Sequence, residues 1–217
     1  MRTVLLVGLG LGLLLTPGCT PISYKPSLSL GESPTTVKCR VQIETFKDES
    51  PTADRGSKVA GTSATEPGTL AGDLAVEVTN AVLTDFSTNQ VFESIQKRMD
   101  DPDLIMRGTI RRFYGHAGPN AIMWATIPVD IIWFFGVPIQ SDEGAVDLEI
   151  SFQRRDGSSV ASYSGHSQFS AWYTIYTNPL LGIPTRLNKA FDQAVIQIRQ
   201  QITADAEKLR HSARPQT

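Results

Sequence analysis

Apolar and polar residues alternate in several stretches of this chain, and each such stretch predicts a strand with one buried face. The first runs from Val37 to Thr45, and a short one follows around Val91 to Ile95. A third runs from Leu104 to Tyr114 with Gly108 in its middle, where a bulge or a close backbone approach is the usual reason for a glycine.

The alternation resumes after a long interval. A fourth strand is marked by Val146, Leu148, Ile150 and Phe152. The pair Asp156-Gly157 is typical of a tight hairpin, so a fifth strand near Ser159 to His166 is expected to run back beside the fourth.

Two segments have helical spacing instead. The first helix has Thr69 in the N-cap position, and its apolar face consists of Leu70, Leu74, Val78, Ala81, Val82 and Phe86. The second begins after Pro184-Thr185, and its apolar stripe consists of Leu187, Phe191, Ala194, Val195, Ile198, Ile202, Ala206 and Leu209. The order β-α-β-β-β-β-α predicts an α/β (α+β) fold, a mixed five-stranded sheet with two helices on one face.

The first 19 residues are typical of an export signal. Arg2 precedes twelve apolar or glycine residues from Val4 to Leu15, too few to span a bilayer as a helix. Small residues then lead to Cys19, which resembles the lipobox cysteine of bacterial lipoproteins. That resemblance implies cleavage after residue 18 and a lipid on the Cys19 thiol. The alternative is ordinary signal cleavage, with Cys19 free to pair with Cys39.

The remaining chain is expected to form a tether and one domain. Residues 19–35 are rich in Pro, Ser and Thr and lack an apolar face, which predicts a lipid anchor followed by a flexible tether. Residues 36–210 are expected to form a single periplasmic domain with a long loop at 47–68 and an apolar insertion at 121–139. Residues 211–217 are expected to be a disordered tail.

Charge and cysteine content exclude two classes of protein. Removal of residues 1–18 takes away one of the 20 basic residues and none of the 22 acidic ones, leaving 19 against 22. Nucleic-acid binding would need a basic stripe, which is absent from the sequence. The two cysteines are too few for a disulfide framework. Cys39 alternates in phase with Val37 and Val41, so we expect a buried, unreactive thiol.

The sequence is most unusual in two aromatic segments, residues 121–139 and 169–183. The first is long and apolar, but Pro128, Asp130, Gly136 and Pro138 interrupt it, which argues against a membrane-spanning helix. The two segments contain all three tryptophans of the chain. Candidate contact residues for a membrane or a partner are Trp124, Trp133, Phe134, Phe135, Trp172 and Tyr173.

Strand counting places the two aromatic segments at one end of the sheet. If strand one is parallel to strand two and strand two pairs antiparallel with strand three, the start of strand one lies at that end too, and the tether and the aromatic segments share it. Two interpretations remain open. Either the segments fold against each other as a satellite core, or part of the aromatic set is exposed and contacts a membrane or a protein.

Signs of catalysis are weak in this sequence. The three histidines, His116, His166 and His211, lie outside any metal-binding spacing, so no metal and no cofactor are expected. His116 and His166 both fall near strand ends at the aromatic end, where a shared site is conceivable. Neither a nucleophile elbow nor a phosphate-binding loop is present in the mature sequence.

The carboxylates have structural explanations. Asp100, Asp101 and Asp103 are expected to form a turn leading into the third strand. Asp130 lies among apolar neighbours and must find a hydrogen-bond donor or stay protonated, and capping a turn is its expected role.

Several features together resemble a family. They are Phe46-Lys47-Asp48 at the end of the first strand, the run Asp103 to Ile110 after a helix, and the hairpin before a closing amphipathic helix. Over about Val37 to Ile202 the chain resembles the periplasmic α/β domain of YajG-like lipoproteins, and it is similar to the TolB N-terminal domain and to CsgG-type lipoproteins. The chain departs from these through its insertion at 121–139, and it lacks strands suited to a CsgG-like barrel.

These observations lead to one main functional hypothesis. We expect a non-enzymatic lipoprotein, anchored by its N-terminal lipid in the bacterial outer membrane and facing the periplasm, that acts as an accessory or assembly partner of a cell-envelope complex. The alternative is a periplasmic binding protein for an apolar or lipid-like ligand held between 121–139 and 169–183. An enzyme using His116 and His166 is the third choice.

Overall fold

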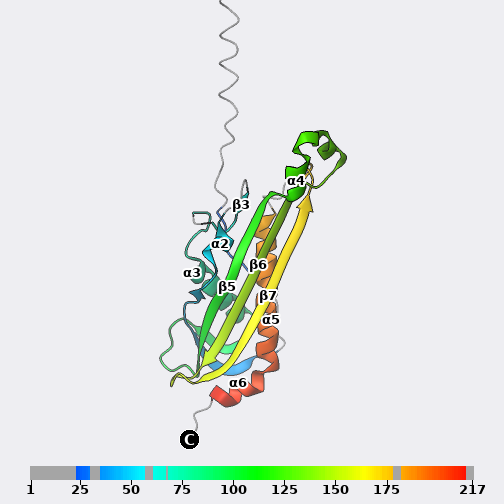
Figure 1. Cartoon of the computed structure of the whole chain (residues 1–217). Coiled ribbons are helices and arrows are strands. Elements are labelled where there is room, and N and C mark those ends of the chain that lie inside the picture. Colours follow the sequence, from blue (N-terminus) through cyan, green and yellow to red (C-terminus); the bar gives the residue numbers. More distant parts are fainter. Residues whose placement is uncertain (1–22, 30–34, 57–60, 67, 178–181, 214–217) are drawn as a thin grey trace, which may run out of the picture.

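A mixed seven-stranded sheet is the framework of the protein (Figure 1). The computed structural model describes residues 23–29, 35–56, 61–66, 68–177 and 182–213. Five strands follow the order β4-β1-β5-β6-β7, and two short strands pair with β5. The five are β1 (Val37–Ile43), β4 (Phe92–Gln96), β5 (Leu104–Pro119), β6 (Gln140–Gln153) and β7 (Ser159–Tyr173). The expected mixed α/β fold is thereby confirmed.

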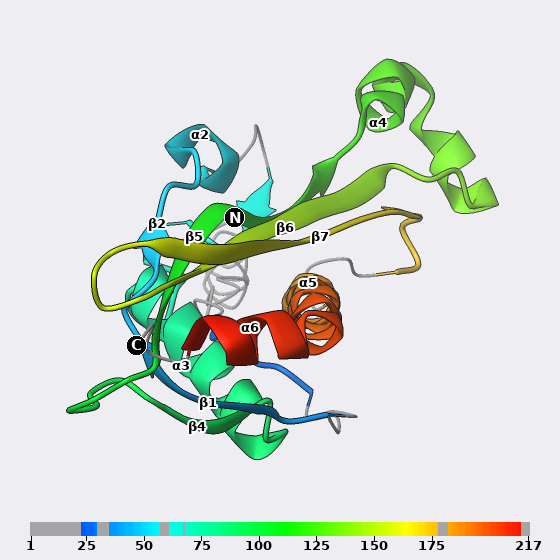
Figure 2. The same ribbon diagram turned by 90° about the horizontal axis from the view of Figure 1, so that it is seen from below.

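The helices pack on one face of this sheet. They are α3 (Leu74–Thr88), α5 (Ile183–Ala204) and α6 (Ala206–Ala213). Seen from below, α5 and α6 lie in the hollow of the curved sheet (Figure 2). The expected long C-terminal helix is divided at Asp205, the C-cap of α5, and Leu209 remains buried on α6. The expected tail at 211–217 begins as the last turn of α6, through Ala213.

The expected loop at 47–68 contains three short elements instead of a continuous loop. They are β2 (Lys47–Asp48), α2 (Thr52–Arg55) and β3 (Thr62–Ser63), and both strands pair with β5. The N-cap of α3 also differs from expectation. Asp73 accepts a hydrogen bond from the Val76 amide, whereas the Thr69 hydroxyl donates to the Ala64 and Glu66 carbonyls in the preceding turn.

The strand directions correct one expectation. β1 lies between β4 and β5 and is parallel to both, so the second and third strands are not antiparallel neighbours. The last three residues of β1 pair with the first three of β5, so β1 starts at the end of the sheet where β5 begins, whereas residues 121–139 follow the end of β5. The beginning of the first strand and the aromatic segments are at opposite ends of the sheet.

Part of the segment expected to be a flexible tether is docked on the domain. Residues 23–29, which we name the strap, cross α3 and α5. Tyr24 is 1% exposed, forms a β-bridge with Leu70, and donates through its hydroxyl to Asn188 Oδ1 at 2.9 Å. Farther along the strap, Ser29 binds Asp192. A buried aromatic ring inside a Pro-rich and Ser-rich segment therefore fixes the strap.

Two glycines allow close packing of neighbouring elements. A Cβ at Gly108 would lie 2.4 Å from the Phe46 ring, so a side chain lies there instead of the expected bulge or close backbone approach. A Cβ at Gly165 would lie 2.0 Å from the Ala194 carbonyl oxygen, so this glycine brings β7 directly against α5.

The exposed edge of β7 is partly covered by glutamines of α5. Gln197 accepts from the His166 amide and donates to the His166 carbonyl, each at 2.9 Å, as a neighbouring strand would. One turn farther, Gln201 donates to the Ser164 carbonyl at 2.7 Å. This arrangement satisfies backbone groups that would otherwise invite pairing with another chain.

Cys39 and Asp85 are buried titratable groups whose pKa values are raised by burial. Cys39 is 1% exposed, which confirms its expected burial, and burial raises the pKa of its thiol to about 12. At the interface of α3 and α5, Asp85 is 2% exposed, forms an ion pair with Arg199 at 3.3 Å and accepts from Asn89 at 2.8 Å. Burial raises the pKa of Asp85 from 3.8 to about 6, and Arg199 opposes that rise.

The Asp85 carboxyl should make stability depend on pH. Since its pKa is higher in the folded state, the folded protein binds this proton more tightly than the unfolded chain does. The protonated Asp85 carboxyl contributes its full share of the free energy of unfolding below about pH 4. This share, up to roughly 3 kcal/mol, is lost as the pH rises through about 6. Urea unfolding of the wild type and Asp85→Asn at several pH values should give a free-energy difference that changes across this window. A difference independent of pH would contradict this assignment.

Candidate functional site: an aromatic tip on a three-stranded arm

The strands β5, β6 and β7 extend past the helices that cover them. α5 begins at Ile183, whose side chain lies against Gly115 of β5, and β5 continues for four more residues to Pro119. The paired ends of β6 and β7 extend with it, through Gln140 opposite Tyr173. We call these projecting strand ends the arm (Figures 1 and 2).

The arm ends in two short helices. α4 (Ala121–Thr126) is capped by Asn120, whose side chain accepts from the Met123 amide at 3.0 Å. The 3₁₀ helix η1 (Ile127–Phe135) follows directly and ends at Gly136, whose φ of 80° favours glycine. Pro128 in the first turn of η1 and this left-handed glycine explain why the apolar run does not continue as one helix. We name α4, η1 and residues 172–176 the tip.

The tip exposes its large apolar side chains. None of the residues of α4 and η1 is buried. Phe135 is 82% exposed, Phe134 68% and Trp172 62%. The remaining exposed apolar residues of the tip are Trp124, Ile127, Val129, Ile131, Ile175 and Tyr176. The satellite-core interpretation therefore does not describe these side chains.

Polar atoms of the aromatic residues bond within the tip. The Trp133 indole Nε1 donates to the Thr126 hydroxyl at 2.8 Å, and Trp133 is half-buried for that reason. The Tyr176 hydroxyl donates to the Phe134 carbonyl at 2.7 Å and ties the two aromatic segments together. The only charged residue in either segment of the tip is Asp130, which is exposed. The outer surface of the tip is consequently apolar and almost uncharged.

The base of the arm contains a carboxylate that sequence reasoning missed. Asp142 of β6 is 1% exposed and forms an ion pair with Arg186 of α5 at 2.5 Å. The Tyr173 hydroxyl donates to the same carboxylate at 3.0 Å, and the Arg186 guanidinium lies 5.0 Å from the centre of the Tyr173 ring. Although residue 173 lies within the tip, the Tyr173 side chain belongs to this clamp between arm and helix and is not among the exposed side chains of the tip. In the sequence, the run Ser141-Asp142-Glu143-Gly144 is typical of a turn, and no apolar periodicity there predicts a buried carboxylate.

The histidines do not form a shared site. His166 is exposed and pairs with Asp147. His116 is buried, with its ring centre 5.1 Å from that of Tyr114. His166 lies opposite Asp147 and His116 opposite Glu143, four positions apart on β6, or about 13 Å along the strand. His211, the third candidate, lies on α6 near Glu207.

The Asp100 to Asp103 turn is structural, as expected. The Arg40 amide donates to the Asp103 carboxylate at 2.7 Å, and the Asp103 amide donates to the Arg40 carbonyl at 2.9 Å. Asp101 forms ion pairs with Arg40 and Arg155. This network holds the start of β5 beside β1. No cluster of His, Cys, Asp or Glu suited to a metal ion occurs among the residues that the structure describes.

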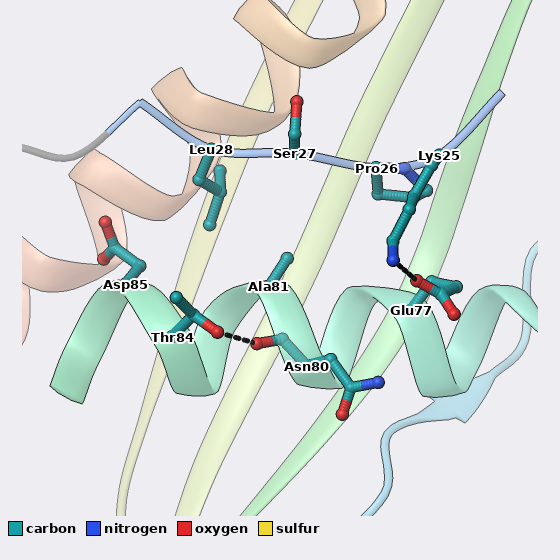
Figure 3. Close-up of a pocket in the computed structure, with 9 residues that line it drawn as sticks. All are labelled: Lys25, Pro26, Ser27, Leu28, Glu77, Asn80, Ala81, Thr84 and Asp85. Carbon is teal, nitrogen blue, oxygen red and sulfur yellow. Dashed lines mark hydrogen bonds and ion pairs between the residues drawn. The ribbon is translucent and has the colours of Figure 1, made fainter. Parts of the chain in front are cut away.

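A cavity of about 260 Å³ lies between the strap and α3, away from the tip (Figure 3). Lys25 forms an ion pair with Glu77 at 3.4 Å at one end of this cavity, and Leu28 points toward α3 at the other. Its volume is below the range of typical small-molecule sites, about 300 to 1,000 Å³. Within the described parts of the chain, no helix is long and apolar enough to cross a membrane.

The sequence matches no family model and no curated protein. Among solved structures, the fold is similar to that of protein XCC0632 from Xanthomonas campestris, which carries the family-model name DUF330. The TM-score is 0.53 at 10% identity, and the match covers 88% of this chain and 98% of that chain. This likeness shows the fold.

Two further structures align less closely. The structure of an uncharacterized protein has a TM-score of 0.41 at 10% identity and covers 81% of this chain and 99% of that chain. A Caulobacter crescentus protein described as "a putative lipoprotein" has a TM-score of 0.30 at 9% identity, over 51% of this chain and 73% of that chain. The narrower resemblance to YajG-like lipoproteins stays a prediction.

Substitutions in the tip should leave the fold intact. Phe135→Ser and Trp172→Ser remove exposed side chains, so each should change the free energy of unfolding by less than about 0.5 kcal/mol. Phe113→Ala, which removes a fully buried ring of β5, should cost about 3 to 5 kcal/mol. Chemical denaturation of the three variants makes the comparison. A large loss of stability for both tip variants would mean that the tip is part of the core.

Proposed function

We propose that this protein is a non-enzymatic lipoprotein of the bacterial cell envelope, attached to the outer membrane through Cys19. Its α/β domain faces the periplasm and serves as an accessory or assembly partner of a larger envelope complex. The observation that carries the proposal is the exposed, nearly uncharged aromatic tip at the end of the arm. Contiguous exposed apolar surface of this kind is typical of interaction sites.

The placement of the titratable groups favours a binding role over catalysis. His116 and His166 are held apart by the strand register, and the carboxylates of the Asp100 to Asp103 turn are engaged with Arg40 and Arg155. The projecting tip likewise favours a surface contact over the alternative of a ligand enclosed between the two aromatic segments.

The site of attachment rests on the N-terminal sequence. Cys19 follows the apolar segment and Gly18, and Thr20 stands where an aspartate favours retention in the inner membrane of enterobacteria. By its resemblance to envelope lipoproteins, the protein is assigned to the outer membrane. Residues 1–22 lie outside the described residues, so this part of the proposal depends on the sequence.

Lipidation can be tested directly. The thioether to the lipid requires the Cys19 thiol, so Cys19→Ser should abolish metabolic labelling with palmitate in the native host. The same variant should move into the soluble fraction after cell lysis, or retain an uncleaved signal. Cys39→Ser is the matched control and should label as the wild type does, because its thiol is buried in the core. Undiminished labelling of Cys19→Ser would refute the proposal.

A further inference from the structure

We propose that the aromatic tip is a second membrane contact, which inserts into the interface of the same lipid leaflet that holds the Cys19 lipid. The proposed occupant of the tip surface is thus the boundary between lipid headgroups and acyl chains. The inference rests on the proposed lipidation of Cys19 and adds what the domain itself does at that membrane.

The direction of the strap is the first argument. Ser29 binds Asp192 of α5, whereas Tyr24 and the Ser27 amide bind Asn188, one turn nearer the start of that helix. The start of α5 lies at the base of the arm, because Ile183 contacts Gly115. Followed toward the N-terminus, the strap therefore runs toward the arm, and its first described residues lie nearer the arm than Ser29 does.

The second argument compares two lengths, the one from Cys19 to Tyr24 and the one from Phe113 to the end of β5. Four residues lie between Cys19 and Tyr24, and the five steps from one Cα atom to the next span at most about 18 Å when fully extended. The Tyr24 ring centre lies 6.3 Å from that of Phe113, and Pro119 follows Phe113 by six residues, or about 20 Å of strand. The tip lies beyond Pro119. A domain attached through Cys19 is thus held close enough for the tip to reach the bilayer.

The chemistry of the tip suits a bilayer interface. The helices α4 and η1 bond part of the peptide groups of the tip internally, which lowers the cost of placing them in an apolar environment. The Trp133 indole and the Tyr176 hydroxyl have partners inside the tip, which leaves the rings of Phe134, Phe135 and Trp172 facing outward. Aromatic and aliphatic side chains of this kind are favoured about 5 to 10 Å deep in the interface.

The charged residues of the arm and the tip determine which lipids the tip should bind and how deeply it inserts. Between Tyr114 and Gln153 the chain contains no Lys or Arg, so attraction to anionic headgroups has no source in the arm or its helical cap. Binding should therefore be similar for zwitterionic and anionic vesicles and insensitive to salt. The exposed Asp130 keeps the contact shallow, because burying its charge would be costly.

The tryptophans give a specific readout, because all three of them, Trp124, Trp133 and Trp172, belong to the tip. The lipidated protein is reconstituted into phosphatidylcholine vesicles, with and without bromine atoms on the acyl chains. Bromine quenches tryptophan only at close range. We expect about a two-fold loss of emission in the brominated vesicles, as follows from interfacial insertion.

Variants separate the tip from the rest of the surface. Ile131→Ser combined with Phe135→Ser retains every tryptophan but removes two of the most exposed apolar side chains, and should abolish most of the quenching. Val76→Ser, at an exposed apolar residue of α3, is the matched control and should be quenched like the wild type. Equal quenching of all three proteins would overturn the inference.

Vesicle flotation distinguishes the inference from the proposed function. If the lipidated protein floats with the vesicles but its tryptophans are not quenched, the lipid anchor is present and the proposed contact between tip and membrane is wrong. The occupant of the tip would then be a protein partner. If the protein carries no lipid on Cys19, the proposed function is wrong. The inference that the tip and the Cys19 lipid enter the same leaflet then fails with it.

Discussion

The difference in rise between strands and helices governs the shape of this protein. A strand advances about 3.3 Å per residue and a helix only about 1.5 Å. The 16 residues of β5 therefore extend about 53 Å, whereas the 22 residues of α5 cover about 33 Å. The four residues of β5 beyond Gly115, about 13 Å of strand, extend past the start of α5. The connection that closes this uncovered end cannot reach the core, and its apolar residues stay exposed.

Two polar arrangements make that geometry stable. At the base of the arm, Asp142, Arg186 and Tyr173 join the last covered part of the sheet to the first turn of α5. Along the helical face, the buried Tyr24 fastens the strap near the same level. The core therefore fixes the position of the arm relative to the strap. An anchored N-terminus then orients the arm, which is the link between the fold and the proposed membrane contact.

The sequence predicted the regular elements well, because they depend on local periodicity. Alternation identified the first and fourth of the expected strands and the buried face of β1 with Cys39, and the Asp156-Gly157 turn identified the hairpin between β6 and β7. Three features depended on long-range contacts instead. The parallel pairing of β1 with β5, the docking of Tyr24 and the burial of Asp142 each involve partners more than 40 residues away. The tip was recognised as an aromatic segment, but its exposure follows from strand and helix lengths that periodicity could not define.

The exposure of the tip in the free protein is the central claim, and tryptophan quenching by acrylamide in solution tests it most directly. Because the chain's three tryptophans all lie in the tip, the signal has no contribution from the core. Trp124 and Trp172 should be quenched almost as strongly as free tryptophan, and half-buried Trp133 less so. Emission shielded from acrylamide in the absence of lipid or partner would show that the tip is buried, and would contradict the account.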